Sequence, residues 1–157
     1  MTDEASAQTD WSLHDCPVYG LFLRPPDPDR GLWRSELVLD IDHIVAWLRG
    51  DDGGFRFRVA PATLTFQDVQ DLRIAVDFTG TAFAPTITEW SVDRVEKRPA
   101  TGAPHPAAFA WQILLNVPAG GLIGLVATGF TIDHRAPPRL TAMQRVDPQD
   151  RPPLTLA

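Results

Sequence analysis

Two copies of the tripeptide Ile-Asp-His, at residues 41–43 and 132–134, supply the residue types best suited to chemistry in this sequence. Carboxylates and imidazoles are ligands of Zn, Mn and Fe, so these acid-imidazole pairs predict a candidate metal site. Asp40 lies two residues before Asp42, and in a strand the two would share one face. The candidate ligands are therefore His14, Asp40, Asp42, His43, Asp133 and His134.

Ordinary strand edges are the favoured explanation of the same pairs. Neighbouring residues of a strand point to opposite faces, so Asp42 and His43 cannot enter one site from a regular strand. The sequence also lacks a spaced ligand pattern such as H-E-x-x-H. The competing interpretation is a solvated strand face, with Asp42 capping a helix and the histidines hydrogen-bonded. A metal-dependent enzyme using the Asp/His pairs is accordingly only the third functional hypothesis.

His14-Asp15-Cys16 places a thiol near an imidazole, the residue types of a cysteine nucleophile and its base. Catalytic partners are assembled across a fold, and adjacent residues seldom point at one another, so a small buried thiol is the favoured interpretation. The glycine-rich stretch at 120–124 lacks the G-x-G-x-x-G spacing of a dinucleotide-binding loop. We expect no catalytic residue and no cofactor.

Charge and composition restrict the partners. The 157 residues carry a formal charge of −6, and no run of Lys and Arg forms a basic stripe, so nucleic acid is not expected to bind. Residues 1–10 lack the pattern of a secretory signal, and the longest nearly apolar run, residues 117–127, is about half a membrane span. A single cysteine agrees with a reducing compartment. We expect a soluble, cytoplasmic protein with no membrane partner.

Alternation of apolar and polar residues predicts strands along most of the chain. The predicted strands cover residues 18–23, 35–42, 55–59 with 64–66, 72–78, 86–95, 109–117 and 122–132. The glycine-bearing break at 118–121 predicts a β-hairpin. Two short helices are also predicted, one from His43 to Arg49 capped by Asp42, and one at the capping-box residues Thr141 and Gln144.

These elements predict one mainly β domain over residues 1–157, either an antiparallel sandwich or a curved, barrel-like sheet of about seven or eight strands with one or two short helices. Parallel architectures need crossover helices, which the pattern lacks. Residues 1–12 are predicted to be a loose N-terminal segment and residues 135–157 a Pro-rich C-terminal tail. Aromatic residues at inward strand positions are assigned to the core: Phe78, Trp90, Phe109, Trp111 and Phe130.

Trp11, Trp33 and Trp47 lie near predicted turns instead, and they are the candidate ligand or interface residues. An aromatic ring with a polar edge suits a pocket rim or a protein interface. Gly31-Leu32-Trp33 also resembles the G-x-W signature of lipocalins, without the companion motifs of that family. This resemblance implies a carrier of small apolar ligands with a cavity inside a curved β-sheet.

Trp11 with His14-Asp15, and the run L-x-F-x-x-V-x-x-L-x-I at residues 64–74, resemble small bacterial β-rich proteins of unassigned role, including some immunity proteins of toxin systems. The resemblance covers about the first half of the chain and transfers no functional residue. It implies a compact acidic protein that occludes a partner, and the negative charge suits a basic toxin surface. The first functional hypothesis is therefore a non-enzymatic module that binds another protein or a second copy of itself; the apolar-ligand carrier is the second.

Overall fold

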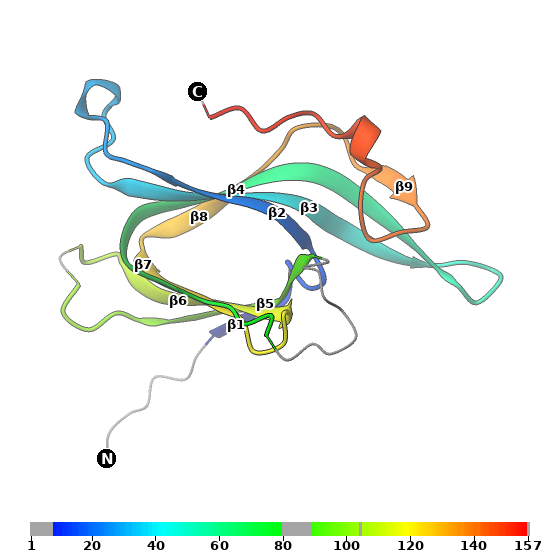
Figure 1. The fold of residues 1–157 in the computed structure, drawn as a ribbon, viewed down its shortest axis with the longest axis horizontal. Helices are drawn as coiled ribbons and strands as arrows, with labels where there is room; N and C mark the ends of the chain where they lie inside the picture. Colours follow the sequence, from blue (N-terminus) through cyan, green and yellow to red (C-terminus); the bar gives the residue numbers. More distant parts are fainter. Residues whose placement is uncertain (1–7, 80–88, 104, 157) are drawn as a thin grey trace, which may run out of the picture.

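The computed structural model describes residues 8–79, 89–103 and 105–156, which form nine strands and two 3-10 turns (Figure 1). The antiparallel, mainly β fold predicted from the sequence is confirmed. No helix in these described ranges is long and apolar enough to cross a membrane. The elements are β1 (Gln8–Asp10), β2 (Pro17–Arg24), η1 (Pro28–Arg30), β3 (Ser35–Arg49), β4 (Phe55–Ala75), β5 (Trp90–Pro99), β6 (Phe109–Val117), β7 (Leu122–Ala127), β8 (Gly129–His134), β9 (Arg139–Thr141) and η2 (Pro148–Asp150).

Six of the strands close into a ring. Antiparallel pairings join β2 to β3, β3 to β4, β4 to β7, β7 to β6 and β6 to β5. The ring closes where Pro17 and Val18 of β2 lie opposite Ser91 and Trp90 of β5. Figure 1 shows the ring flattened into two layers, with β2, β3 and β8 above and β5 and β6 below. The barrel-like alternative of the predicted fold is the one observed.

The long central strand β4 makes this curvature possible. Its 21 residues pair with β3 along one edge and with β9, β8 and β7 in turn along the other. Asp68 and Asp71 have φ angles of 55° and 51°, and the register with β7 shifts between Gln70 and Arg73. A bulged strand bends, so the last part of β4 turns into the second layer. The bend lies between the predicted runs 64–66 and 72–78, and the break between 55–59 and 64–66 lies at Pro61, which β4 contains.

Both helices predicted from capping signals are wrong. Residues 43–49 continue β3, with a bulge between Ile44 and Ala46, and pair with residues 55–60 of β4. Thr141 ends β9 instead of opening a helix. Asp42 is therefore not a helix cap. The capping pattern at Asp42 does not produce a helix, because pairing with β4 provides backbone hydrogen bonds for residues 43–49. Ile, Val and Trp in this segment also favour strands.

The hairpin predicted at 118–121 is confirmed, since β6 and β7 pair directly on either side of it. Gly120 has a φ of 79° there, a conformation that glycine adopts without strain. The single run predicted at 122–132 is two strands, β7 and β8, which pair with different parts of β4. Of the strand predicted at 86–95, residues 86–88 lie outside the described residues, and β5 begins at Trp90.

The chain ends are more integrated than their composition predicted. Gln8–Asp10, the described part nearest the N-terminus, is paired with β5 as strand β1. The Pro-rich segment after residue 135 contains β9, which pairs with β4, and Val146 in this segment is 5% exposed. In Figure 1 this segment lies over the outer side of the upper layer.

Aromatic side chains fill the centre of the barrel. Phe66 of β4 is fully buried and packs edge-on against Trp111 of β6, with 5.7 Å between ring centroids. Phe130 of β8 lies 5.2 Å from Phe66 and 5.5 Å from Trp111. Trp90 and Phe109 are partly buried against this core, as predicted, and Phe78 stacks on Trp90. Fully buried aliphatic residues surround the rings: Leu37, Leu39, Ile41, Leu64, Ile113 and Ile123.

Candidate functional site

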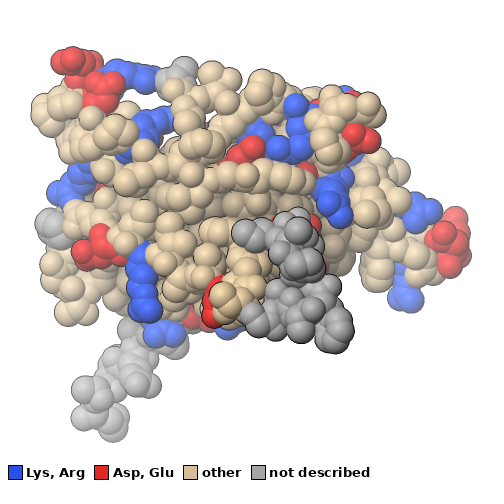
Figure 2. All heavy atoms as spheres, viewed as in Figure 1, with Lys and Arg blue, Asp and Glu red and all other residues tan. Residues whose placement is uncertain are grey.

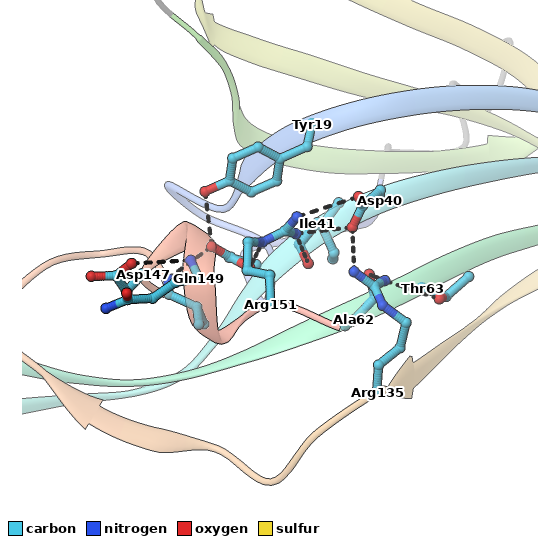
Figure 3. Close-up of polar contacts among 11 residues, drawn as sticks. Tyr19, Asp40, Ile41, Ala62, Thr63, Arg135, Asp147, Gln149 and Arg151 are labelled. Carbon is cyan, nitrogen blue, oxygen red and sulfur yellow. Dashed lines mark hydrogen bonds and ion pairs between the residues drawn. The ribbon is translucent and has the colours of Figure 1, made fainter. Parts of the chain in front are cut away.

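The two aspartates of β3 form an ion-pair cluster with arginines of the C-terminal segment (Figure 3). Arg151 donates from Nε to Asp42 Oδ1 at 3.1 Å and from Nη2 to Asp40 Oδ1 at 2.9 Å. Arg135 donates to the same oxygen of Asp40 at 2.6 Å, and also to the Ala62 carbonyl at 2.6 Å. Asp42 is fully buried, so this pairing compensates for the loss of its hydration.

The second oxygen of Asp42 is satisfied as well. It accepts from the Tyr19 hydroxyl at 2.8 Å and from the backbone N–H of Val146 at 2.9 Å. The guanidinium of Arg151 lies 3.8 Å from the centroid of the Tyr19 ring, a cation–π contact. Burial and the neighbouring charge of Asp42 raise the pKa of Tyr19. Asp42 therefore has a structural partner on each oxygen and no oxygen free for a metal ion.

Sequence reasoning missed Arg135 and Arg151, although a signal for them existed. Asp40 and Asp42 stand on one face of a strand whose intervening residues are apolar, and buried carboxylates require cationic or hydrogen-bonding partners. Arg135 and Arg151 lie in the Pro-rich segment that was treated as a tail. Together they hold this segment on the outer side of β3.

The two histidines of the Ile-Asp-His tripeptides come together, whereas their aspartates do not. His43 Nδ1 lies 2.9 Å from His134 Nε2, with 5.2 Å between ring centroids. His43 pairs with Ala60 on one side of β4 and His134 with Ala62 on the other. The small alanine side chains leave room for the imidazoles to meet across the strand. Asp133 is exposed, on the alternate face of β8.

The environment of His43 favours its neutral form. Burial, followed by the proximity of His134, lowers the pKa of His43, and a backbone hydrogen bond to Ser12 opposes this shift. Within the described residues, no three His, Cys, Asp or Glu side chains are placed to hold one metal ion together. The predicted six-residue ligand set is thus divided among the ion-pair cluster (Asp40 and Asp42), the histidine pair (His43 and His134), His14 and the exposed Asp133.

His14 lies instead at the centre of an exposed group of rings, here called the aromatic surface (Trp11, His14, Trp47 and Phe55). Its imidazole packs edge-on against Trp11, with centroids 5.8 Å apart, and stacks on Trp47 at 6.1 Å. Trp47 in turn meets Phe55 edge-on at 6.2 Å. His14 Nδ1 lies 2.8 Å from the Asp93 carbonyl, which fixes the ring against β5. This arrangement joins the β1–β2 turn to the far end of the β3–β4 hairpin.

Trp33 does not belong to this group. It precedes β3, and Trp47 lies near the other end of that 15-residue strand. Trp33 is 75% exposed, the largest exposed fraction among the exposed large hydrophobic residues of the described chain. Of the three tryptophans predicted as interface residues, the structure brings Trp11 and Trp47 together and leaves Trp33 apart.

Cys16 is a buried thiol. It is fully buried, and its Sγ accepts from the backbone N–H of Ile44 at 3.4 Å. Burial raises the pKa of the thiol to about 12, so Cys16 stays protonated at neutral pH. A nucleophilic cysteine needs a lowered pKa, which this environment does not provide. His14, engaged by Asp93 and Trp47, is directed elsewhere.

Comparisons with protein-family models, with curated proteins and with solved structures found no match.

Proposed function

We propose that the protein is a non-enzymatic binding module that recognises another protein through the aromatic surface. The observation that carries this proposal is the continuity of exposed rings from different elements: Trp11 is 57% exposed, Trp47 44% and Phe55 51%, and His14 links them. Exposed aromatic groups of this kind are typical of protein interfaces, where Trp is a frequent source of binding energy.

The turn that presents Trp11 and His14 is held in place before any partner arrives. Leu13 between them is 1% exposed and anchors the turn in the core. Backbone hydrogen bonds join His14 N–H to the Trp11 carbonyl at 3.0 Å and Asp15 N–H to the Val92 carbonyl at 2.7 Å. A preorganised surface loses less conformational entropy on binding, which supports a recognition role.

Charged groups of both signs surround the aromatic surface. The guanidinium of Arg94 lies 5.8 Å from the Trp11 ring, and Asp52 pairs with Arg56 at 3.5 Å near the hairpin tip. Figure 2 shows Lys and Arg interspersed with Asp and Glu over the described part of the face in view, with no broad basic area on it. An apolar centre with a polar rim is the usual anatomy of a protein interface.

The proposal includes the expected biological setting of an immunity-like, cytoplasmic bacterial protein with a basic partner. The formal charge of −6 supports a basic partner through electrostatic complementarity. The free thiol of Cys16 is compatible with a reducing compartment.

The test uses single substitutions of exposed rings. Immobilised wild-type protein is used to isolate a binding protein from native extract, and the affinity of the purified pair is then measured by calorimetry. Trp11→Ser and Phe55→Ser should each weaken binding about tenfold or more, because interface aromatics are common hot spots. Trp33→Ser, a matched change at the other end of β3, should bind like wild type.

Two results would overturn the proposal: wild-type affinity in both Trp11→Ser and Phe55→Ser, or no bound protein together with a monomer in light scattering. Self-association that these substitutions abolish would support the proposal, with a second copy of the chain as the partner. Melting temperatures of the variants check that folding is intact.

A second candidate, binding of a small apolar ligand, is supported by a pocket of about 380 Å³ where β2 meets β5. Val18, Leu21 and Trp90 give it an apolar lining, and Arg145 lies at its side. Buried hydrophobic side chains occupy the core, which supports this surface pocket as the ligand site of the second candidate. Titration with anilinonaphthalene sulfonate should show saturable fluorescence at one site; a rise that does not saturate removes this candidate.

A further inference from the structure

The contact between His43 and His134 has the geometry of two ligands of one metal ion. The nitrogens that face each other, His43 Nδ1 and His134 Nε2, are 2.9 Å apart, and the ring planes are inclined by 53°. Both rings lie beside β4 at positions fixed by the ladder, opposite Ala60 and Ala62. Both histidines are therefore held by paired strands and not by flexible loops.

We propose that His43 and His134 together bind one divalent transition-metal ion, with Cu²⁺ as the best fit. Imidazole nitrogens bind such ions at about 2.0–2.1 Å, so a separation of 2.9 Å corresponds to an angle of about 90° at the metal. That is the angle between neighbouring ligands in square-planar or tetragonal sites, which Cu²⁺ and Ni²⁺ prefer. A tetrahedral Zn²⁺ site would require the nitrogens to separate to about 3.3 Å.

Each ring has a second nitrogen that takes no part in the contact, Nε2 of His43 and Nδ1 of His134. A neutral imidazole carries one proton, so when that proton is on the second nitrogen, the facing nitrogen presents its lone pair. With both rings in this form, the two facing nitrogens can coordinate the same ion.

Without metal, the facing nitrogens share one proton in an N–H···N hydrogen bond, whose donor depends on the tautomers of the two rings. On metal binding, the donor ring carries that proton on its second nitrogen instead, and both facing nitrogens are free to coordinate. His134 is exposed, so water can reach the remaining coordination positions. With two protein ligands the site is open, and we expect it to bind the ion more weakly than a closed structural site does. This proposal is independent of the aromatic surface.

The test titrates full-length protein, freed of tags and stripped with chelator, with Cu²⁺ alone. Calorimetry should show one equivalent bound, and electron paramagnetic resonance should show coupling to two imidazole nitrogens. His43→Gln and His134→Gln should each weaken binding about tenfold or more and remove one nitrogen from the spectrum. His105→Gln, the same change at a histidine in a separate turn, should bind like wild type.

His134 is exposed, so His134→Gln should keep the wild-type melting temperature even if His43→Gln does not. A loss of Cu²⁺ affinity in His134→Gln therefore cannot be caused by misfolding. Equal Cu²⁺ affinity in wild type, His134→Gln and His105→Gln would overturn the proposal. So would a spectrum with a single coupled imidazole nitrogen in wild type. In either case the contact would be a plain N–H···N hydrogen bond.

Discussion

Arg151 Nε and Asp42 Oδ1 lie 3.1 Å apart, joining the C-terminal segment to the outer face of β3 across 109 positions of sequence. Asp42 is fully buried and Arg151 is only 13% exposed, so neither charge is well hydrated. In such a pair, the attraction offsets the desolvation of both groups only while both partners remain. The contact therefore makes the C-terminal segment a structural part of the barrel.

Arg151→Met should lower the free energy of unfolding by about 3–5 kcal/mol, because it leaves the buried carboxylate of Asp42 without its cationic partner. Urea unfolding followed by tryptophan fluorescence measures this change. Arg139→Met is the matched control: Arg139 pairs with Asp150 at 3.3 Å, but both side chains are largely exposed. Its loss should cost less than about 1 kcal/mol. Equal effects of the two substitutions would contradict a structural role for Arg151.

Tyr19, the single tyrosine of the chain, reports on the same cluster. Burial and the charge of Asp42 raise its pKa above the ordinary value of about 10. Spectroscopic titration at 295 nm should therefore show no tyrosinate near pH 10 in the folded protein. Asp42→Asn removes the neighbouring negative charge and should let Tyr19 ionise at a lower pH than in wild type. Half-ionisation near pH 10 in folded wild type would contradict this.

The raised pKa of Tyr19 also has a consequence for stability. Its folded-state pKa exceeds the unfolded value, so the unfolded state releases the proton first as pH rises. The stabilisation is fully present below about pH 10 and is lost as pH rises through the folded-state pKa. Tyr19→Phe removes the titrating group and should flatten this part of the profile, measured by urea unfolding between pH 8 and pH 11. An unchanged slope in the variant would contradict the assignment.

Cys16 should be inert in the folded protein. Its thiol is fully buried and its pKa is raised to about 12, whereas a thiol reagent requires access to the thiolate. Ellman's reagent at pH 8 should release no colour from native protein and one equivalent after unfolding in guanidinium. Rapid stoichiometric reaction of native protein would show that the 11–16 turn opens readily.

The alternation of apolar and polar residues predicted most strands, because this pattern lies within each strand and involves residues only two positions apart in sequence. Residues 109–117 and the following hairpin are the clearest example, since a strict inward set and a glycine turn agree. The extension of β3 through His43–Arg49 could not be predicted in the same way. Its cause is pairing with residues 55–60, and this long-range ladder overrides the local cap signal at Asp42.

The sequence predicted which Asp and His residues could form a site, but it did not predict which of them lie together in the structure. The pattern placed His134 with Ile132 on one face, and His43 occupies the alternate position to Asp42. It could not show that β3 and β8 flank the same strand, because that depends on pairings between residues far apart in sequence, His43 with Ala60 and His134 with Ala62. The partners of Asp40 and Asp42 were hidden for a similar reason: they come from a segment 95 to 111 residues away.

The backbone conformation at position 120 requires glycine, whereas the space around this position would accept a larger side chain. Its φ is 79°, and nothing lies within 4 Å of the position that a Cβ would take. Gly120→Ala should therefore lower the free energy of unfolding by about 1 kcal/mol through backbone strain alone. Gly124, on β7 of the same hairpin, also has open space but no positive φ, so Gly124→Ala should be neutral or slightly stabilising. Paired urea unfolding curves measure both changes, and a Gly124→Ala loss as large as that of Gly120→Ala would show that strain at φ is not the cause.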